Sequence, residues 1–188
     1  MDNATQGFNY YALQVKTREE KKFMRKAQGM NPDLPLSLYF PQREMKIRKR
    51  GKVRSTRLAV FPGYVFLELG SDEDARNYRW AFKGIDGFYR FLKSNDKITQ
   101  LQDRDLELVL HFIKKVGPVA GVSKVYFDEN SRIVVLAGPL SGLEGKIVKV
   151  DKRKRRAKIV LDLYGDTFSL DLAFEVIEKV KEHKGAVL

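Results

Sequence analysis

Cysteine is absent from this 188-residue chain, and the only histidines are His111 and His183. The missing thiols exclude disulfides, thiolate nucleophiles and the common structural zinc sites. The two histidines would need carboxylate partners to hold a metal, and no group of these residues has ligand spacing. We therefore expect no metal site and no cofactor.

Long apolar runs are also missing. No stretch approaches the roughly 20 apolar residues that a membrane helix needs. The N-terminal sequence MDNATQGFNYYALQV has neither the basic nor the apolar region of a signal peptide. These features predict a soluble cytoplasmic protein with no membrane partner.

Signatures of catalysis are few. The glycines between Gly138 and Gly145 are not followed by the Lys-Ser/Thr pair that would hold a nucleotide and magnesium. Asp103 and Asp105 precede a predicted helix, where carboxylates usually cap the helix rather than form a catalytic pair. The sequence predicts a protein that is not an enzyme.

Positive charge, by contrast, is abundant and concentrated. The net charge is +12, yet residues 43–57 and residues 146–158 each hold eight Lys or Arg and one acid, so each segment carries +7. The remaining residues together carry −2. Two basic patches on a near-neutral body are typical of polyanion binding, although each run could also be a solvated hairpin tip.

Residues 8–116 are predicted to form an α/β sandwich, because helix and strand patterns alternate. Apolar alternation at 10–15, and short apolar runs at 37–41, 44–47, 57–61, 64–69 and 87–92, indicate strands. Thr17 and Glu20 have the spacing of a capping box at the start of a helix that Asn31-Pro32 would end. A short helix after Asp72 and a longer one from Asp103 complete the domain.

The second half of the chain has a different pattern. Residues 117–126 are predicted to be a linker, because Gly117, Pro118 and Gly121 interrupt the apolar periodicity. Short strands are expected at 132–136, 146–150, 158–163 and 167–172, with no helix-length pattern between them. Such spacing is typical of a small β-barrel, which we expect over residues 127–182.

Specific motifs add to these patterns. GPLSGLEGKIVKVD, at residues 138–151, resembles the KOW motif of NusG-type factors, with Gly138, Gly142 and Gly145 allowing tight turns. FPGYVFLEL at 61–69 resembles the FPGYV segment of the family's N-terminal domain, and NYYALQV at 9–15 resembles its first strand. The sequence thus resembles the NusG family of transcription factors, which implies a NusG-type α/β sandwich followed by an SH3-like KOW barrel.

This resemblance implies that the N-terminal domain docks on the clamp helices of the largest RNA polymerase subunit. The residues that match the family's apolar concavity are Tyr11, Phe61, Pro62, Tyr64 and Phe66. Alternation places Tyr64 and Phe66 on one face of their strand and Val65 and Leu67 on the other. We expect the aromatic side to be the partly exposed docking face, since large aromatics anchor interfaces.

The segment DKRKRR, at residues 151–156, is more basic than a general NusG factor requires. In this respect the chain resembles the specialised LoaP or RfaH type of antiterminator. A compact basic loop of this kind could bind a folded RNA hairpin. The first basic run could lie near upstream DNA, and Lys83 could meet the non-template strand. The predicted nucleic-acid-binding residues are Lys149, Lys152, Arg153, Lys154, Arg155, Arg156 and Lys158, with Arg48, Lys49, Arg50, Lys52 and Arg54.

Two other functions stay open. The chain could be a general NusG elongation factor that couples polymerase to Rho or to a ribosomal protein through the apolar pair Leu163 and Tyr164. It could also be a ribosome-associated RNA-binding KOW protein, although the FPGYV segment argues against a barrel acting alone.

Overall fold

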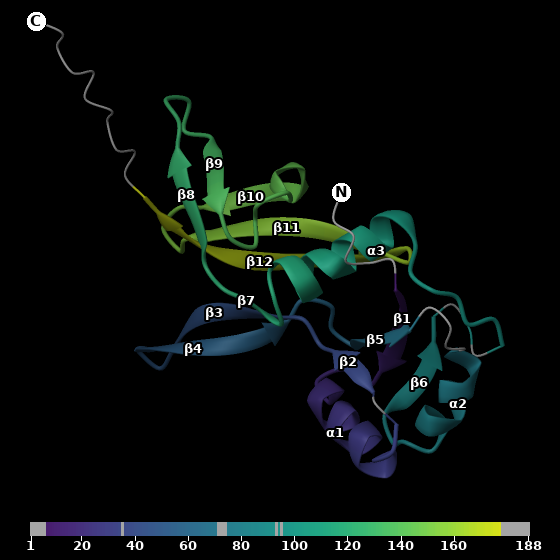
Figure 1. Ribbon diagram of the computed structural model, residues 1–188. Helices are drawn as coiled ribbons and strands as arrows, with labels where there is room; N and C mark the ends of the chain where they lie inside the picture. Colours follow the sequence, from purple (N-terminus) through teal and green to yellow (C-terminus); the bar gives the residue numbers. More distant parts are fainter. Residues whose placement is uncertain (1–6, 35, 71–74, 93, 95, 178–188) are drawn as a thin grey trace, which may run out of the picture.

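The computed structural model describes residues 7–34, 36–70, 75–92, 94 and 96–177 (Figure 1). Its N-terminal half contains a four-stranded antiparallel sheet in the order β2-β5-β1-β6. The strands are β1 (Phe8–Val15), β2 (Ser37–Tyr39), β5 (Tyr64–Gly70) and β6 (Phe88–Phe91). The expected helix cap at Asp72 lies outside the described residues.

Two helices cover one face of this sheet, α1 (Glu20–Met30) and α2 (Ala75–Lys83) (Figure 1). Phe23 of α1 and Phe82 of α2 are buried against Val65 and Leu67 of the sheet. The opposite face is covered by α3 (Asp103–Leu110), which continues as a π-helical turn, η2 (His111–Lys115). The layered arrangement agrees with the predicted sandwich.

A long hairpin projects from this domain. It is formed by β3 (Gln42–Lys49) and β4 (Lys52–Ala59), which turn at Arg50 and Gly51, both with positive φ. A two-residue strand, β7 (Val119–Ala120), pairs in parallel with the base of β3. Figure 1 shows the hairpin reaching away from the sandwich and beneath the C-terminal sheet.

The C-terminal half forms a five-stranded sheet in the order β10-β11-β12-β8-β9. Its elements are β8 (Ser123–Phe127), β9 (Ile133–Ala137), the short 3₁₀ helix η3 (Glu144–Lys146), β10 (Ile147–Asp151), β11 (Arg156–Leu163) and β12 (Asp166–Val176). Neighbouring strands are antiparallel except β12 and β8, which pair in parallel. The four expected strands are present, within a residue or two of their predicted limits at most ends.

Part of the predicted linker is ordered as strand. β7 lies inside it, and β8 begins there, at Ser123. Ser123 and Val125 are fully buried whereas Lys124 is exposed, but this alternation is too short to stand out from the glycine-rich sequence before it.

The capping predictions are wrong. The α1 helix has Glu19 at its N-cap with no side-chain hydrogen bond, and the buried Glu20 carboxylate instead accepts the Gly63 N–H at 2.8 Å. Likewise α3 has Gln102 at its N-cap, and the Asp105 carboxylate accepts a long bond from the Tyr164 N–H, 3.4 Å. Both acids serve contacts with distant loops, which local spacing cannot reveal.

The Gly138 turn provides a stability test. Its φ is +96°, and a Cβ there would lie 2.7 Å from the Ser123 Cα. We expect Gly138→Ala to lower the free energy of unfolding by about 2 kcal/mol or more, from strain and overpacking together. Gly145→Ala is the matched control, because nothing lies within 4 Å of its Cβ position. Thermal denaturation of both variants measures the difference, and equal midpoints would contradict this account of the turn.

Candidate functional site

Three of the predicted docking residues lie together. Phe61, Tyr64 and Phe66, called here the aromatic face, pack on the side of the N-terminal sheet that α3 and η2 cover. The Phe61 ring meets Phe66 edge-on at 5.6 Å between centroids, and Phe112 of η2 at 5.8 Å. Offset and edge-on aromatic pairs of this kind stabilise a contact beyond their buried area.

Tyr11 does not belong to this cluster. In the β1–β5 register Ala12 lies opposite Phe66 and Tyr11 lies opposite Leu67, so Tyr11 faces the helices α1 and α2. Its neighbour Tyr10 is the residue on the aromatic side. The prediction that Tyr11 shares a face with Phe66 is therefore wrong by one position, which in a strand means the opposite face. Pro62 is exposed beside the cluster.

The C-terminal domain covers the aromatic face. The Phe168 ring of β12 meets Phe61 at 5.5 Å and Tyr64 at 5.7 Å, both edge-on, and the Tyr64 hydroxyl donates to the Asp166 carboxylate. Burial and this hydrogen bond raise the pKa of Tyr64. Tyr64 is 4% exposed and Phe66 fully buried. The expectation of a partly exposed face is thus wrong in this arrangement, called closed below, because both faces of β5 are covered.

Further contacts join the two halves. His111 Nε2 lies 2.9 Å from the Pro139 carbonyl oxygen, and burial lowers the pKa of this histidine. At the β11–β12 turn Leu163 is fully buried, and Tyr164 adopts a positive φ and packs against the shared core. The apolar pair expected to meet Rho or a ribosomal protein is therefore part of the contact between the domains.

A polar network that the sequence analysis missed borders the aromatic face. The Glu68 carboxylate accepts from the Tyr10 hydroxyl at 2.5 Å and the Tyr39 hydroxyl at 3.1 Å, and it pairs with Lys114 Nζ at 2.6 Å. These hydrogen bonds outweigh burial and lower the pKa of Glu68, while burial and Glu68 raise the pKa of Tyr10 to about 12. A single acid in the apolar run YVFLEL was the available signal.

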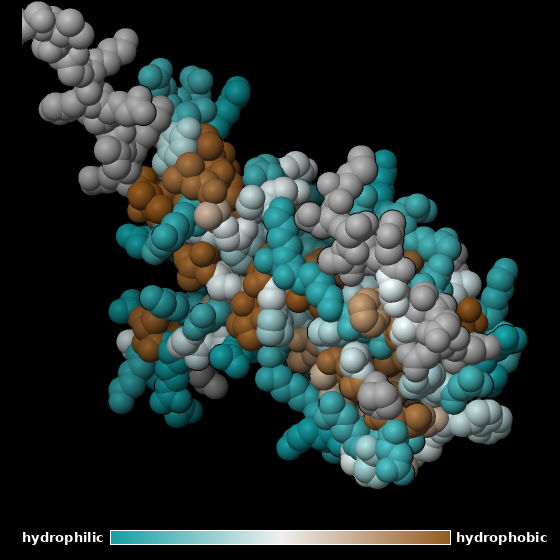
Figure 2. Space-filling view, in the orientation of Figure 1, coloured by the Kyte–Doolittle hydropathy of each residue, from teal (hydrophilic) through white to brown (hydrophobic). Residues whose placement is uncertain are grey.

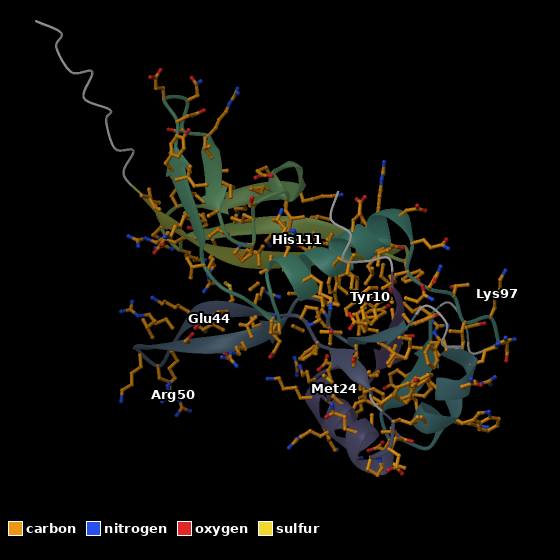
Figure 3. All side chains as sticks on the ribbon, in the orientation of Figure 1. Tyr10, Met24, Glu44, Arg50, Lys97 and His111 are labelled. Carbon is orange, nitrogen blue, oxygen red and sulfur yellow. The ribbon has the colours of Figure 1, made fainter. Side chains whose placement is uncertain are left out.

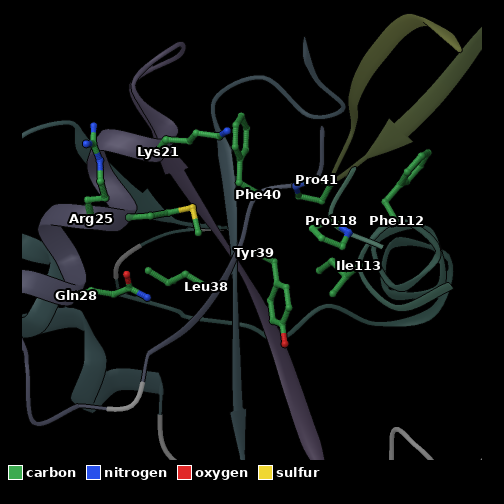
Figure 4. Close-up of a pocket in the computed structure, with 11 residues that line it drawn as sticks. Lys21, Arg25, Gln28, Leu38, Tyr39, Phe40, Pro41, Phe112, Ile113 and Pro118 are labelled. Carbon is green, nitrogen blue, oxygen red and sulfur yellow. The ribbon is translucent and has the colours of Figure 1, made fainter. Parts of the chain in front are cut away.

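An open groove adjoins the same region (Figure 4). It has a volume of about 660 Å³ and lies between α1, the segment after β2 and η2. Its floor is apolar, with two cations on α1 at one side. The lining residues are Lys21, Met24, Arg25, Gln28, Leu38, Tyr39, Phe40, Pro41, Phe112, Ile113 and Pro118. Phe112 and Ile113 connect it to the aromatic cluster, so apolar surface remains accessible in the closed arrangement.

The basic segment 151–156, called here the basic loop, is a tight turn between β10 and β11. Asp151 orders it, because its carboxylate accepts the Lys154 N–H at 2.8 Å and lies 3.8 Å from Lys154 Nζ, and both interactions lower its pKa. Arg155 adopts a positive φ, and the Lys152 ammonium lies 4.2 Å from the Phe127 ring centre. The side chains of residues 152–155 are exposed. The structure therefore brings the predicted cations together on one turn.

The β3–β4 hairpin presents the other basic run. Its exposed cations include Lys46, Arg48, Arg50, Lys52, Arg54 and Arg57. Three apolar side chains are exposed among them: Ile47 and Leu58, each 37% exposed, share one face of the hairpin, and Val53, 61% exposed, lies on the other. The side chain of Lys49, also predicted to bind nucleic acid, lies outside the part that the structure describes. Figure 2 shows mostly hydrophilic residues around this projecting part of the molecule.

Among the residues that the structure describes, no helix is long and apolar enough to cross a membrane.

Comparison with known proteins gives one consistent family. The family model described as "Transcription termination factor nusG" matches residues 8–110, more than half of the chain. The Bacillus subtilis protein "Transcription termination/antitermination protein NusG" is 27% identical over 92% of this chain and 94% of its own length. The Thermus thermophilus protein of the same description is 23% identical over 90% and 97%. The solved structure "Domain interaction in Thermotoga maritima NusG" covers 88% of this chain and 93% of its own, with 17% identity and a TM-score of 0.49.

Proposed function

The chain belongs to the NusG family, and we propose that it is a transcription antitermination factor that docks on RNA polymerase and binds structured RNA. The docking surface is the aromatic face on the N-terminal domain, residues 8–116. The RNA-binding surface is the basic loop on the C-terminal domain, residues 127–182, which we take to be a KOW barrel. Residues 117–126 join the two.

One observation carries the docking assignment. Phe61, Tyr64 and Phe66 gather on one face of the N-terminal sheet, and their cover comes from another domain rather than only from their own. Aromatic side chains anchor many protein interfaces, so a cluster that is covered by another domain suits docking on a partner once that cover moves away. Docking then requires the C-terminal domain to move off the face, because Phe168 occupies it in the closed arrangement.

The basic loop supports the specialised form of this function. Its side chains from Lys152 to Arg155 are exposed on an ordered turn, and Lys149 and Lys158 lie next to them in register. Phosphate contacts by several such cations release counterions and give strong, salt-dependent affinity. A general elongation factor, which couples polymerase to other proteins, has no need of this charge.

The general function remains the second candidate, favoured by the presence of Leu163 and Tyr164. In the closed arrangement this pair packs at the domain contact, so Rho or a ribosomal protein could reach it only after opening. Both candidates share polymerase docking, and they differ in whether the basic loop is needed for activity.

Docking is tested by the double substitution Phe61→Ala with Tyr64→Ala. We expect it to weaken binding to core polymerase, and to an isolated clamp-helix fragment, by at least about tenfold, because interface aromatics often contribute 2 kcal/mol or more. Trp80→Ala is the control, since Trp80 is 72% exposed on α2, on the opposite side of the sheet. Wild-type affinity in the double variant would show that the docking face lies elsewhere.

A further inference from the structure

Positive charges are crowded within the β10–β11 hairpin and within the β3–β4 hairpin. In the β10–β11 ladder Lys149 lies directly opposite Lys158, and the exposed Arg48, Arg50 and Lys52 crowd the end of the β3–β4 hairpin. Cations placed directly across a ladder repel each other and destabilise the pair. A polyanion lying along either hairpin would remove this repulsion.

The two hairpins also meet, although they are about a hundred residues apart in sequence. The Arg156 guanidinium at the start of β11 donates to the Lys46 carbonyl oxygen of β3 at 2.6 Å, and β12 runs beside β3. Figure 1 and Figure 3 show the hairpin, with Glu44 and Arg50 labelled, beneath the C-terminal sheet. The closed arrangement therefore brings two segments of +7 each into one region.

The junction itself has more positive than negative charge. Arg43 of β3 and Arg156 both lie near Asp171, whose carboxylate is 4.0 Å from Arg156 Nη1. Arg43 Nη1 donates to the Ala59 carbonyl oxygen, whereas its buried Nε has no hydrogen-bond partner. Lys149, Lys154 and Lys158 line a hollow of about 140 Å³ beside the same junction. Asp151 also lines this hollow, and the two carboxylates do not neutralise two guanidiniums and three ammonium groups.

We propose that the β3–β4 hairpin and the basic loop form one composite surface for the stem of an RNA hairpin, and that this surface is complete only when the domains are closed. This rests on the proposed RNA-binding function and extends it to the N-terminal domain. Where Arg156 contacts Lys46, the two patches lie closer together than the Debye length, which is about 8 Å at physiological ionic strength, so their charges repel each other. A phosphate backbone spanning both removes that repulsion, so RNA binds the closed form more tightly than the open form.

Coupling to polymerase follows by linkage. A partner that needs the open form lowers the affinity of any ligand that prefers the closed form. That ligand lowers the affinity of the partner by the same factor. RNA captured on the composite surface would bring the factor to the transcript. Docking on the clamp helices would then uncover the aromatic face and release the RNA from the β3–β4 hairpin.

The test uses two charge-neutralised variants and a synthetic RNA hairpin. One variant changes Arg48, Arg50, Lys52 and Arg54 to Gln, and the other changes Lys152, Arg153, Lys154 and Arg155 to Gln. RNA affinity is measured from 50 to 200 mM salt. We expect each variant to flatten the salt slope by about two units or more, at up to 0.9 for each phosphate that is no longer neutralised, and to bind at least tenfold more weakly.

Domain closure is followed separately. Val53→Cys and Val148→Cys place spin labels on exposed sites of the two hairpins, 61% exposed each, in a chain with no other cysteine. We expect the RNA hairpin to narrow the distance distribution between the labels, and a clamp-helix fragment to broaden it.

The outcomes separate the two proposals. If the loop variant loses affinity while the hairpin variant matches wild type, the loop binds RNA alone and the composite surface is wrong. If the loop variant binds RNA as tightly as wild type, the proposed RNA-binding function itself is wrong, and the composite surface with it. Equal affinity for a DNA hairpin of the same sequence would overturn the assignment to RNA, and an unchanged label distribution on RNA binding would overturn the coupling to closure.

Discussion

Replacing Phe168 with serine is expected to strengthen polymerase docking by about 5- to 100-fold. Phe168 makes two edge-on contacts with the aromatic face, to Phe61 and Tyr64. Each such pair contributes about 0.5–1.5 kcal/mol beyond area burial, so removing the ring shifts the domains toward the open form by roughly 1–3 kcal/mol. The apparent affinity of a factor that docks only when open rises in proportion to its open fraction. Titration of a clamp-helix fragment measures the change.

Tyr64→Ala is the informative control, because it breaks the same ring contact from the other side. It also removes the hydrogen bond to Asp166 and opens the domains, but it takes away part of the docking face itself. We expect the Phe168→Ser variant to bind the clamp-helix fragment more tightly than wild type, and the Tyr64→Ala variant to show no such increase in affinity. Val148→Ser controls for the removal of an exposed apolar residue in the C-terminal domain. An unchanged Phe168→Ser affinity would mean that closure does not limit docking.

The N-terminal sandwich could be predicted because its signals are local. The helix that ends before Asn31-Pro32 follows from backbone restriction, and the strands follow from alternation. The motif FPGYV then identified three residues that do lie together. The sequence did not show which face each tyrosine of NYY occupies, because the two are adjacent. Only the pairing register with β5 shows that Tyr10 shares a face with Phe66.

What could not be predicted is mostly non-local. The alternation of Tyr64 and Phe66 with Val65 and Leu67 indicates two faces, but it does not say that a second domain covers one of them. Two acids with the spacing of helix caps each accept a backbone N–H from a loop that is distant in sequence. The meeting of Arg156 with β3 likewise depends on how the domains pack. Charge counting located both basic runs without showing that they are neighbours.

Neutralising the basic loop distinguishes the specialised factor from the general one. In the variant with Lys152, Arg153, Lys154 and Arg155 changed to Gln, we expect most affinity for structured RNA to disappear, since these side chains are exposed on an ordered turn. With four phosphates no longer neutralised, the fall in affinity between 50 and 200 mM salt should be roughly 100-fold smaller than in wild type. Retaining Asp151 preserves the carboxylate that accepts the Lys154 N–H, so the turn itself should remain.

The decisive readout is antitermination in a reconstituted transcription system. Polymerase docking should survive in the loop variant, because the aromatic face is apolar and lies in the other domain. If RNA recruits the factor, antitermination should fall in parallel with RNA affinity. A control with Lys16, Lys22, Arg76 and Lys97 changed to Gln removes the same charge from exposed sites on the N-terminal domain. Figure 3 shows Lys97 on the far side of the molecule from Arg50. That variant should keep RNA binding and antitermination. Full activity in the loop variant would instead mean that the loop is a solvated hairpin tip, and that the chain acts as a general elongation factor.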